Sequence, residues 1–381
     1  QPLLYQVATA TLNPSNVAAP LRAILRRQKN TTVILAEATS IDLTNKKVIL
    51  NDGELSYDYL IVATGGTPSY FSHEEWATYA PSLKSIEDAL EIRKRIFLAF
   101  EKAEREHDFA RQREWLTFVI IGGGPTGVEL AGALAEISRH TLIKDFRNIN
   151  PAQARILLVE AASEILPTFH HKLALQAEQA LGRLGVEIRP NSRVTKIDEN
   201  GLWIGSEYIC ARTMFWAAGV RASPIAESLR VPLDRMGRVL VQQDLTIPGH
   251  TEVFIIGDLA AFQQDGKMVP GLAPVAMQEG RHAAENILRA LEGKPTKNFR
   301  YADRGLLTTI GRGWAIASFR RLQLNGFGAW MIWVLVHIYF LIGFRNRLFV
   351  MSEWAWHYLT FWCGARLITG ERYAHKHKEG S

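Results

Sequence analysis

Short apolar runs alternate along this chain with longer segments of helical periodicity. The runs have the length of β-strands and are bounded by turn residues. We expect strands at Val33–Ala36, Tyr59–Ala63, Leu116–Ile121, Arg155–Glu160, Thr213–Ala217 and Val253–Ile256. Strands that are apolar throughout are typical of parallel sheets covered on both faces, and their alternation with helices predicts an α/β fold.

One helix has a clear predicted start. Ser85 and Asp88 have the spacing of a capping box, and Ile92, Ile96 and Phe100 follow on one helical face. A mixed-charge stretch at 101–114 then precedes the strongest strand. We interpret it as a solvated helix end with a linker, and it marks the first domain boundary.

The last seventy residues differ from the rest. Residues 327–344 contain His337 as the only side chain that titrates near neutral pH and would span roughly 27 Å as a helix, close to the bilayer core of about 30 Å. A second apolar segment, 348–362, is interrupted by Glu353 and His357. Five of the ten tryptophans fall here: Trp330, Trp333, Trp354, Trp356 and Trp362.

The charge distribution changes the meaning of this segment. The formal net charge is +6, and residues 312–381, with nine Lys and Arg against three Asp and Glu, carry the whole excess. A cationic, Trp-rich apolar segment is typical of a membrane surface and argues against a nucleic-acid-binding face. A buried dimer-forming helix pair, a transmembrane segment and an in-plane anchor are the alternatives, and the sequence favours the in-plane anchor.

The two cysteines, Cys210 and Cys363, lie far apart and form no C-x-x-C pair. This spacing argues against disulfide scaffolds, zinc modules and dithiol redox enzymes, and it predicts a reducing compartment. We therefore predict no metal site.

A glycine-rich turn is the strongest chemical signal. Gly122, Gly124 and Gly127 stand directly between an apolar strand and a helical pattern of small residues. The first glycine permits the tight turn, the second lets the backbone approach a pyrophosphate, and the third allows close helix packing. The context favours dinucleotide binding over a purely structural turn.

The next strand ends in an acid, Glu160. A carboxylate at this position accepts hydrogen bonds from the ribose hydroxyls of NADH and repels the 2′-phosphate of NADPH. Glu160 follows Gly127 by 33 residues, so the intervening region must contain an insertion. An exposed glutamate at a strand end is the alternative.

Three further strand ends are suited to a planar ligand. Ala63-Thr64-Gly65 and Ala217-Ala218-Gly219 bring small residues to the end of an apolar strand, although each alone could be a packing turn. Gly257-Asp258 closes another strand, and its Asp suits the sugar-alcohol chain of a flavin. A helix predicted to open at residues 274–280 could aim its first N–H groups at the flavin edge.

In this order the motifs resemble those of flavoprotein reductases with two dinucleotide-binding domains. Within them, QPLLYQVAT at 1–9, GGGPTGVE at 122–129 and IGFRNR at 342–347 look like the bacterial type II, non-proton-pumping NADH:quinone oxidoreductases. The resemblance covers nearly the whole chain.

The resemblance implies two Rossmann-like domains and a C-terminal helical membrane-anchoring region. It places the first part of the FAD-binding domain at 1–114, the NADH-binding domain at 115–232, the second FAD part with the quinone-site helix at 233–320 and the anchor at 321–381. In the family a first Gly-rich turn, which binds the FAD pyrophosphate, precedes the segment like Gln1–Tyr5. We expect the first domain to be incomplete at its N-terminus for this reason, and FAD binding to be weak or absent.

The implied reaction passes a hydride from NADH to FAD and then two electrons to a membrane quinone. The resemblance gives Glu129 a gating or proton-handling role and lets Gln278 face the quinone, although a solvated helix glutamate describes Glu129 equally well. The implied cofactor-binding residues are Gly122, Gly124, Gly127, Glu160, Gly219, Ala63, Thr64, Gly65, Gly257, Asp258, Ala276 and Met277. The expected location is peripheral, at the cytoplasmic face of the cell membrane, and a homodimer is left open.

Other functions are also considered. A soluble flavin reductase for a dithiol or protein partner is one alternative, but this chain has no redox cysteine pair. A sulfide:quinone oxidoreductase is another, and it would need reactive cysteines near the flavin. A non-catalytic, membrane-bound nucleotide-binding regulator is a different class. It would be colourless when purified and would not oxidise NADH.

Overall fold

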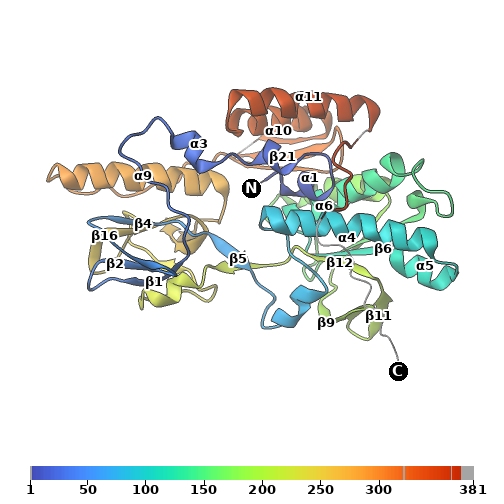
Figure 1. The fold of residues 1–381 in the computed structure, drawn as a ribbon, viewed down its shortest axis with the longest axis horizontal. Helices are drawn as coiled ribbons and strands as arrows, with labels where there is room; N and C mark the ends of the chain where they lie inside the picture. Colours follow the sequence, from blue (N-terminus) through green and yellow to red (C-terminus); the bar gives the residue numbers. More distant parts are fainter. Residues whose placement is uncertain (1, 321, 362, 370–381) are drawn as a thin grey trace. The chain divides into compact units, whose positions relative to one another are not determined.

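A computed structural model describes residues 2–320, 322–361 and 363–369 (Figure 1). Arg321, where the anchor was predicted to begin, Trp362 and residues 370–381 lie outside the described residues, as does Gln1. The chain forms two compact units. Unit 1 comprises Gln1–Ala19, His73–Ala218 and Leu306–Ser381, and unit 2 comprises Pro20–Ser72 and Gly219–Gly305. The four predicted domain ranges stay predictions.

The central sheet of unit 1 is parallel and buried. It contains β6 (Thr117–Ile121), β7 (Arg155–Val159), β8 (Val186–Arg189) and β12 (Thr213–Trp216) in the order β12-β6-β7-β8. Every residue of β6 and β12 is buried, as expected of a sheet covered on both faces. Three predicted strands and the α/β class are confirmed here.

Helices cover this sheet. The capping box predicted at α4 (Ile86–Arg105) is confirmed, because Asp88 N donates to Ser85 Oγ at 3.0 Å and Ser85 N to Asp88 Oδ2 at 2.9 Å. The short α1 (Leu4–Ala8) is wholly buried and packs on α4 and on α6 (Pro125–Glu136). The other helices of this part are α2 (Pro14–Val17), α5 (Phe109–Trp115) and α7 (His171–Arg183), and a π-turn at Ile137–Thr141 prolongs α6.

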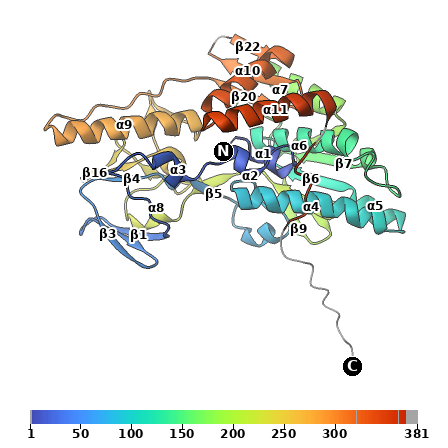
Figure 2. The same ribbon diagram turned by 45° about the horizontal axis from the view of Figure 1, so that its top comes forward.

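Two antiparallel sheets complete unit 1. The first, inserted between β8 and β12, consists of β9 (Val194–Asp198), β10 (Gly201–Ile204) and β11 (Glu207–Cys210). The second, β20 (Leu306–Thr309), β21 (Ala315–Phe319) and β22 (Leu322–Asn325), packs against α10 (Gly326–Phe340). The last helix, α11 (Phe344–Thr360), lies beside α10 (Figure 1 and Figure 2).

The apolar segment expected at 327–344 is not one helix. α10 ends at Phe340, and Gly343 has a φ of +87° before α11 begins. The Arg347 side chain donates to the carbonyls of Tyr339 and Leu341 at 2.8 Å each, which satisfies the open end of α10. None of the helices in the described residues is both long and apolar enough to cross a membrane.

Unit 2 is built on smaller sheets. β16 (His250–Ile255) lies between β4 (Leu60–Val62), parallel to it, and β15 (Thr246–Ile247), antiparallel to it. These confirm the predicted strands near residues 59–63 and 253–256. A three-stranded antiparallel sheet has the order β1 (Ala38–Asp42), β2 (Lys47–Leu50), β3 (Gly53–Ser56). The remaining strands form two-stranded sheets: β5 (Gly66–Pro68) with β13 (Val220–Ala222), β14 (Val239–Leu240) with β17 (Ala260–Ala261), and β18 (Gln263–Gln264) with β19 (Lys267–Met268).

Three helices accompany these strands: α3 (Leu21–Leu25), α8 (Ile225–Ser228) and the long α9 (Ala273–Leu291). The strand predicted at Val33–Ala36 is wrong, because this segment is irregular and Leu35 is 95% exposed. No strand in the described part of the chain pairs with it, so its backbone hydrogen-bonding groups have no ladder to join.

Candidate nucleotide and flavin sites

The three glycines of the turn after β6 differ in how closely other atoms pack against them. A Cβ on Gly127 would lie 1.9 Å from Gly122 O, and one on Gly122, whose φ is +113°, would lie 2.6 Å from Ala217 C. A Cβ on Gly124 would meet no atom within 4 Å. Gly122 and Gly127 are therefore required by packing, whereas Gly124 leaves open space above the turn.

The start of α6 offers hydrogen-bond donors to an anion. Gly124 is its N-cap and forms no side-chain cap hydrogen bond. Pro125 at the first helical position has no N–H, so the N–H groups of Thr126 and Gly127 and the positive end of the helix dipole are what the turn offers to an anion. This arrangement fits the pyrophosphate of a dinucleotide, which NADH carries.

Glu160 follows β7 and lies against the same turn. Its Oε2 accepts from Gly123 N at 2.6 Å and its Oε1 from Ala162 N at 2.7 Å. The carboxylate is half-buried and fixed beside the glycines, where the predicted ribose role requires it. Each carboxylate oxygen can accept a further hydrogen bond, so the role in ribose binding stays a prediction compatible with this geometry.

In unit 2 the structure brings two predicted flavin motifs together. Ala63-Thr64-Gly65 follows β4 and Gly257-Asp258 follows β16, and the register pairs Ile255 with Val62. Because the two strands are parallel, both motifs lie at the same edge of the sheet. Ile256 N donates to Val62 O at 3.1 Å and joins the two strand ends.

Other glycines lie around Asp258. The Asp258 Cβ is 3.5 Å from the position of a Cβ on Gly66, and its Oδ1 is 3.1 Å from a Cβ on Gly271. Gly219, another predicted residue, lies directly before β13 and has a φ of +84°. Its carbonyl oxygen accepts a hydrogen bond from Ser69 N at 3.3 Å. Gly66 and Gly271 thus lie beside Asp258, which leaves room for the sugar-alcohol chain of a flavin.

The first turn of α9 lies against Gly257, because a Cβ on that glycine would be 3.5 Å from Ala276 Cβ. Two N–H groups of this turn, those of Val275 and Ala276, bond to Leu272 O at 3.0 and 3.1 Å. The flavin edge would therefore interact chiefly with the positive end of the helix dipole. Met277, the neighbouring predicted residue, is exposed.

The Gln278 side-chain amide forms hydrogen bonds with backbone groups. Its Nε2 donates to Pro274 O and Ala302 O at 3.1 Å each, and its Oε1 accepts from Ala302 N at 3.0 Å. The predicted quinone-facing role stays a prediction.

The sequence analysis missed Glu279. It is 2% exposed, and its Oε2 accepts from Gly257 N at 2.6 Å. Burial, with a smaller contribution from the charge of Asp258, raises the pKa of Glu279 to about 7. The only sequence signal is its position three residues after Ala276, on the face of α9 that turns inward.

Glu129, two residues after Gly127, faces a cavity of about 50 Å³ in unit 1. Its Oε1 accepts from Thr308 Oγ1 at 3.2 Å and from Thr309 N at 3.5 Å. Burial raises the pKa of Glu129 to about 8, against which the two hydrogen bonds act. Glu129 is thus half-buried and hydrogen-bonded instead of fully solvated, and its predicted role stays a prediction.

The cavity wall comes from segments far apart in the chain. It is lined by Tyr5, Gln6, Thr11, Glu129, Ala133, Glu136, Thr309, Gly311, Arg312, Trp330, Trp333, Trp354, His357 and Tyr358. The wall therefore connects the nucleotide-binding helix α6 to the aromatic C-terminal helices within one unit.

Comparison with known proteins identifies the family of this chain. The pyridine nucleotide-disulphide oxidoreductase family matches residues 1–280. The type II NADH:quinone oxidoreductase Ndh of Mycobacterium tuberculosis is 41% identical over 388 residues, which are 98% of this chain and 83% of that protein. A type II NADH:quinone oxidoreductase of Staphylococcus aureus is 33% identical over 316 residues, 81% of this chain and 77% of that protein.

Solved structures show the same fold. NDH2 from Plasmodium falciparum, in complex with NADH, aligns with a TM-score of 0.86 at 18% identity and covers 97% of this chain and 92% of that chain. The sulfide:quinone oxidoreductase of Aquifex aeolicus aligns with a TM-score of 0.70 at 19% identity, covering 91% and 82%. At these identities the likeness concerns the fold alone.

The fold and the two groups of sites define a nucleotide-dependent flavoprotein oxidoreductase. With relatives at 33 to 41% identity over most of their length, the chain belongs to the type II NADH:quinone oxidoreductase family. The predicted family, the enzyme class of NADH dehydrogenase and the cofactors FAD and NADH are thereby confirmed.

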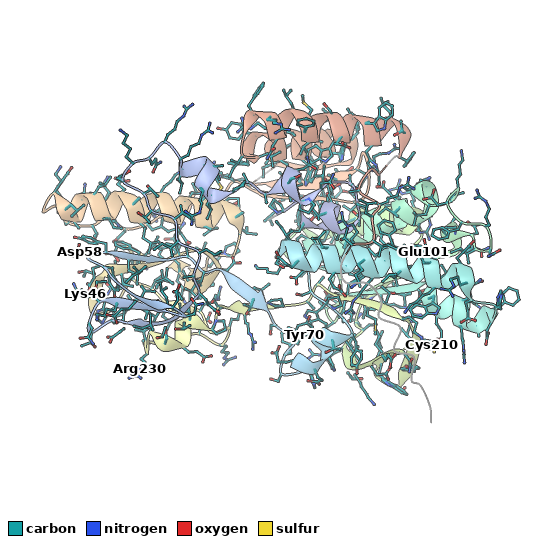
Figure 3. The ribbon with its side chains drawn as sticks, viewed as in Figure 1. Lys46, Asp58, Tyr70, Glu101, Cys210 and Arg230 are labelled. Atoms are coloured by element: carbon teal, nitrogen blue, oxygen red, sulfur yellow. The ribbon has the colours of Figure 1, made fainter. Side chains whose placement is uncertain are left out.

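The cysteines agree with this assignment. Cys210 is exposed at the end of β11 (Figure 3), and Cys363 is buried in unit 1 among Thr11, Thr141 and His357. Neither lies in the unit that carries the predicted flavin motifs, as a sulfide-oxidising relative would need.

Proposed function

We propose that this chain oxidises NADH, reduces a membrane quinone through FAD and pumps no protons, and that Glu129 supplies a proton to the quinone. One observation carries the proposal: the helix that begins at the nucleotide turn places a half-buried carboxyl in a cavity lined by the C-terminal aromatic residues. When bound, FAD supplies the hydride acceptor and the electron donor. The net reaction converts NADH, a proton and a quinone into NAD⁺ and a quinol.

The residues of the chain divide the remaining work. The glycine turn and the N-terminus of α6 hold the pyrophosphate, and Glu160 binds the ribose. The unit 2 motifs at Ala63–Gly65 and Gly257–Asp258, with the first turn of α9, hold the flavin. Glu129 is suited to proton transfer because a pKa of about 8 leaves it protonated at neutral pH.

Glu129→Gln tests this role, because it removes the titrating group and keeps the size. We expect the kcat for reduction of a short-chain quinone to fall about a hundredfold. Anaerobic reduction of the flavin by NADH, followed by stopped-flow absorbance, should keep the wild-type rate.

Glu101→Gln on the exposed face of α4 is the matched control and should change neither rate (Figure 3). Unchanged rates of both half-reactions in Glu129→Gln would contradict the proton role. If the wild-type protein oxidised NADH with none of the quinones tested, the whole proposal would be contradicted.

We further propose peripheral attachment to the cytoplasmic face of the membrane through α10 and α11. α10 is apolar on all sides, yet only Ala329 and Trp333 are buried in it. Apolar side chains at helical spacing remain exposed on both helices: Phe327, Met331, Leu335, Tyr339, Phe344, Leu348, Met351 and Leu359. An exposed apolar face of this kind, with Arg345 beside it, suits the interface of a bilayer.

Removal of everything after Arg321 would be a poor test of this anchor. Trp333, Val350 and Trp354 belong to the core of unit 1, and Trp354 Nε1 donates to Gln6 Oε1 at 2.7 Å. Such a truncation would expose the core as well as remove the anchor. Substitutions on the exposed face separate the two effects.

We expect the double variant Leu335→Gln, Leu359→Gln to bind anionic phospholipid vesicles at least a hundredfold more weakly, because each leucine contributes roughly 1.5 kcal/mol or more on burial. The two side chains are 64% and 76% exposed, so folding should be unaffected. The matched control is Leu175→Gln on α7, 42% exposed, which should bind vesicles as the wild type does. Equal cosedimentation of all three proteins would contradict the anchor.

The homodimer stays a proposal with a direct test. Sedimentation velocity in detergent, with the wild type and the double leucine variant, would separate a dimer formed through this face from one formed elsewhere. A dimer that persists in the variant would be formed elsewhere, and the exposed face of α10 and α11 would then be free to bind lipid.

A further inference from the structure

A second carboxylate, that of Glu136, lines the same cavity as Glu129. Glu136 is the last residue of α6, seven residues after Glu129, so both side chains lie on one face of the helix, about 10 Å apart along its axis. Ala133, between them, also lines the cavity. The cavity thus follows the helix face from one acid to the other.

Glu136 is held where it can exchange a proton. Its Oε1 accepts from Arg312 N, and burial raises the pKa of Glu136 to about 7 while the charge of Arg312 lowers it. The Arg312 side chain in turn bonds to the carbonyls of His357 and Tyr358. Tyr358 is 39% exposed, so the Glu136 end of the cavity borders the protein surface.

Tyr5 lies within electrostatic reach of both acids. Burial raises the pKa of Tyr5 well above its ordinary value, and the charges of Glu129 and Glu136 raise it further. Gln6 Nε2 donates to the Tyr5 hydroxyl at 3.0 Å, and Trp354 Nε1 donates to Gln6 Oε1 at 2.7 Å. This wall of the cavity is therefore rigidly bonded.

An unpaired donor points to water in the cavity. Trp333 is 2% exposed and lines the cavity, and its Nε1–H has no acceptor among the described residues. Buried waters typically bond to such otherwise unpaired polar groups, and a volume of about 50 Å³ has room for a few of them.

We propose that Glu136 and water in this cavity return solvent protons to Glu129. The inference rests on the proposed function, since it takes Glu129 as the proton donor to the quinone. Each turnover consumes one solvent proton in total. Glu129 gives its proton to the quinone oxygen and receives another through water from Glu136, which is reprotonated from solvent beside α11.

The groups around Glu136 that titrate or carry charge come from every neighbouring segment. They are Tyr5, Glu129, Arg139, His140, Arg312, His357, Tyr358 and Cys363. Of these, Arg312 is the cation that opposes the rise of the Glu136 pKa, and the charge of Glu136 in turn acts on Tyr5 and Cys363.

Infrared titration of the purified protein tests the relay without turnover. We expect the C=O band of protonated carboxyl groups to lose a component near pH 7 in Glu136→Gln and a component near pH 8 in Glu129→Gln. An unchanged band in Glu136→Gln would overturn the inference.

Kinetics then separate the relay from other uses of the cavity. Glu136→Gln should lower the kcat of quinone reduction about tenfold with an unchanged KM for quinone and an unchanged rate of flavin reduction. Ala133→Leu, which fills the space between the acids, should do the same, while Glu101→Gln changes nothing.

A rise in the KM for quinone in Ala133→Leu, with an unchanged kcat, would instead show that the cavity holds quinone and would overturn the relay. If Glu129→Gln slows quinone reduction but Glu136→Gln does not, the relay fails and the proposed function stands. If neither variant slows it, the proton role of Glu129 fails first.

Discussion

The two units hold a glycine turn in contrasting ways. In each, a glycine with positive φ follows a parallel strand, Gly122 at +113° in unit 1 and Gly257 at +72° in unit 2. In each, a backbone N–H of the turn donates at 2.6 Å to a carboxylate, from Gly123 to Glu160 and from Gly257 to Glu279. In both units this hydrogen bond fixes the orientation of the turn relative to a carboxyl group.

The difference lies in what surrounds the turn. In unit 1 the helix begins at once and the backbone is so close that a methyl on Gly127 would lie 1.9 Å from a carbonyl oxygen. In unit 2 the nearest atom to a methyl on Gly257 is 3.5 Å away, and α9 begins only at Ala273. We infer that the first turn is fixed chiefly by sterics and the second chiefly by the buried acid Glu279.

The largest expected effect is that of Gly127→Ala. The added methyl overlaps Gly122 O, and forcing the turn apart should lower the free energy of unfolding by about 3 kcal/mol. The gain in helix propensity, about 1 kcal/mol, is too small to offset this. Urea unfolding followed by tryptophan fluorescence measures the loss.

Gly257→Ala is the matched change in unit 2. It meets only an ordinary contact, and the strain of a positive φ should cost about 1 kcal/mol. Equal losses in the two variants would show that sterics do not distinguish the turns.

Next in size is the pH dependence of Glu279→Gln. The pKa of Glu279 is about 7 in the folded protein against an ordinary 4.5, so the folded state binds the proton more tightly. Wild-type stability therefore falls as pH rises through that interval, by up to about 3 kcal/mol for one fully buried group. The variant should be the more stable protein at pH 8 and should show a flatter profile of Tm against pH.

The amide that this substitution introduces can still accept from Gly257 N, so the turn itself should survive. Glu129 and Glu136 also have raised pKa values, and some decline with pH will remain. A profile identical to that of the wild type would mean that Glu279 is already ionised in the folded protein.

The smallest effect on stability belongs to Gly124→Ala. A methyl there meets no atom within 4 Å, but alanine is a weaker N-cap than glycine, so the free energy of unfolding should fall by about 0.5 kcal/mol. The same methyl would stand in the space left for the pyrophosphate, and we expect the KM for NADH to rise about tenfold. Gly182→Ala on α7, equally uncrowded, should leave the KM for NADH unchanged and should raise the free energy of unfolding by up to about 1 kcal/mol through helix propensity. An unchanged KM in Gly124→Ala would remove this glycine from the nucleotide site.

The contrast between the turns also explains what the sequence could predict. Gly122, Gly124 and Gly127 are contiguous with their strand and helix, and Ser85 lies three residues from its capping partner, so local spacing is enough. Glu279 acts on a glycine 22 residues away, and nothing in that interval announces the contact. Its burial follows from how α9 meets the end of β16.

The cavity beside Glu129 was beyond prediction for the same reason. Tyr5, Glu136, Arg312 and Trp333 meet there only because α1, α6, the β20–β21 turn and α10 pack together. The break between α10 and α11 is likewise set by Gly343 and by Arg347 capping, which an apolar run does not reveal. The sequence predicted two apolar segments, 327–344 and 348–362, and the structure places the break between them earlier, at residues 341–343.

The bond between Gln6 and Trp354 has a consequence for synthesis. Its two partners are 348 residues apart, so α1 leaves the ribosome long before the helix that completes its surroundings. At 5 to 20 residues per second the first helix waits roughly 20 to 70 s for this partner. During that interval the buried face of α1 depends on other surfaces for cover, and unit 1 closes only after α11 has been synthesised.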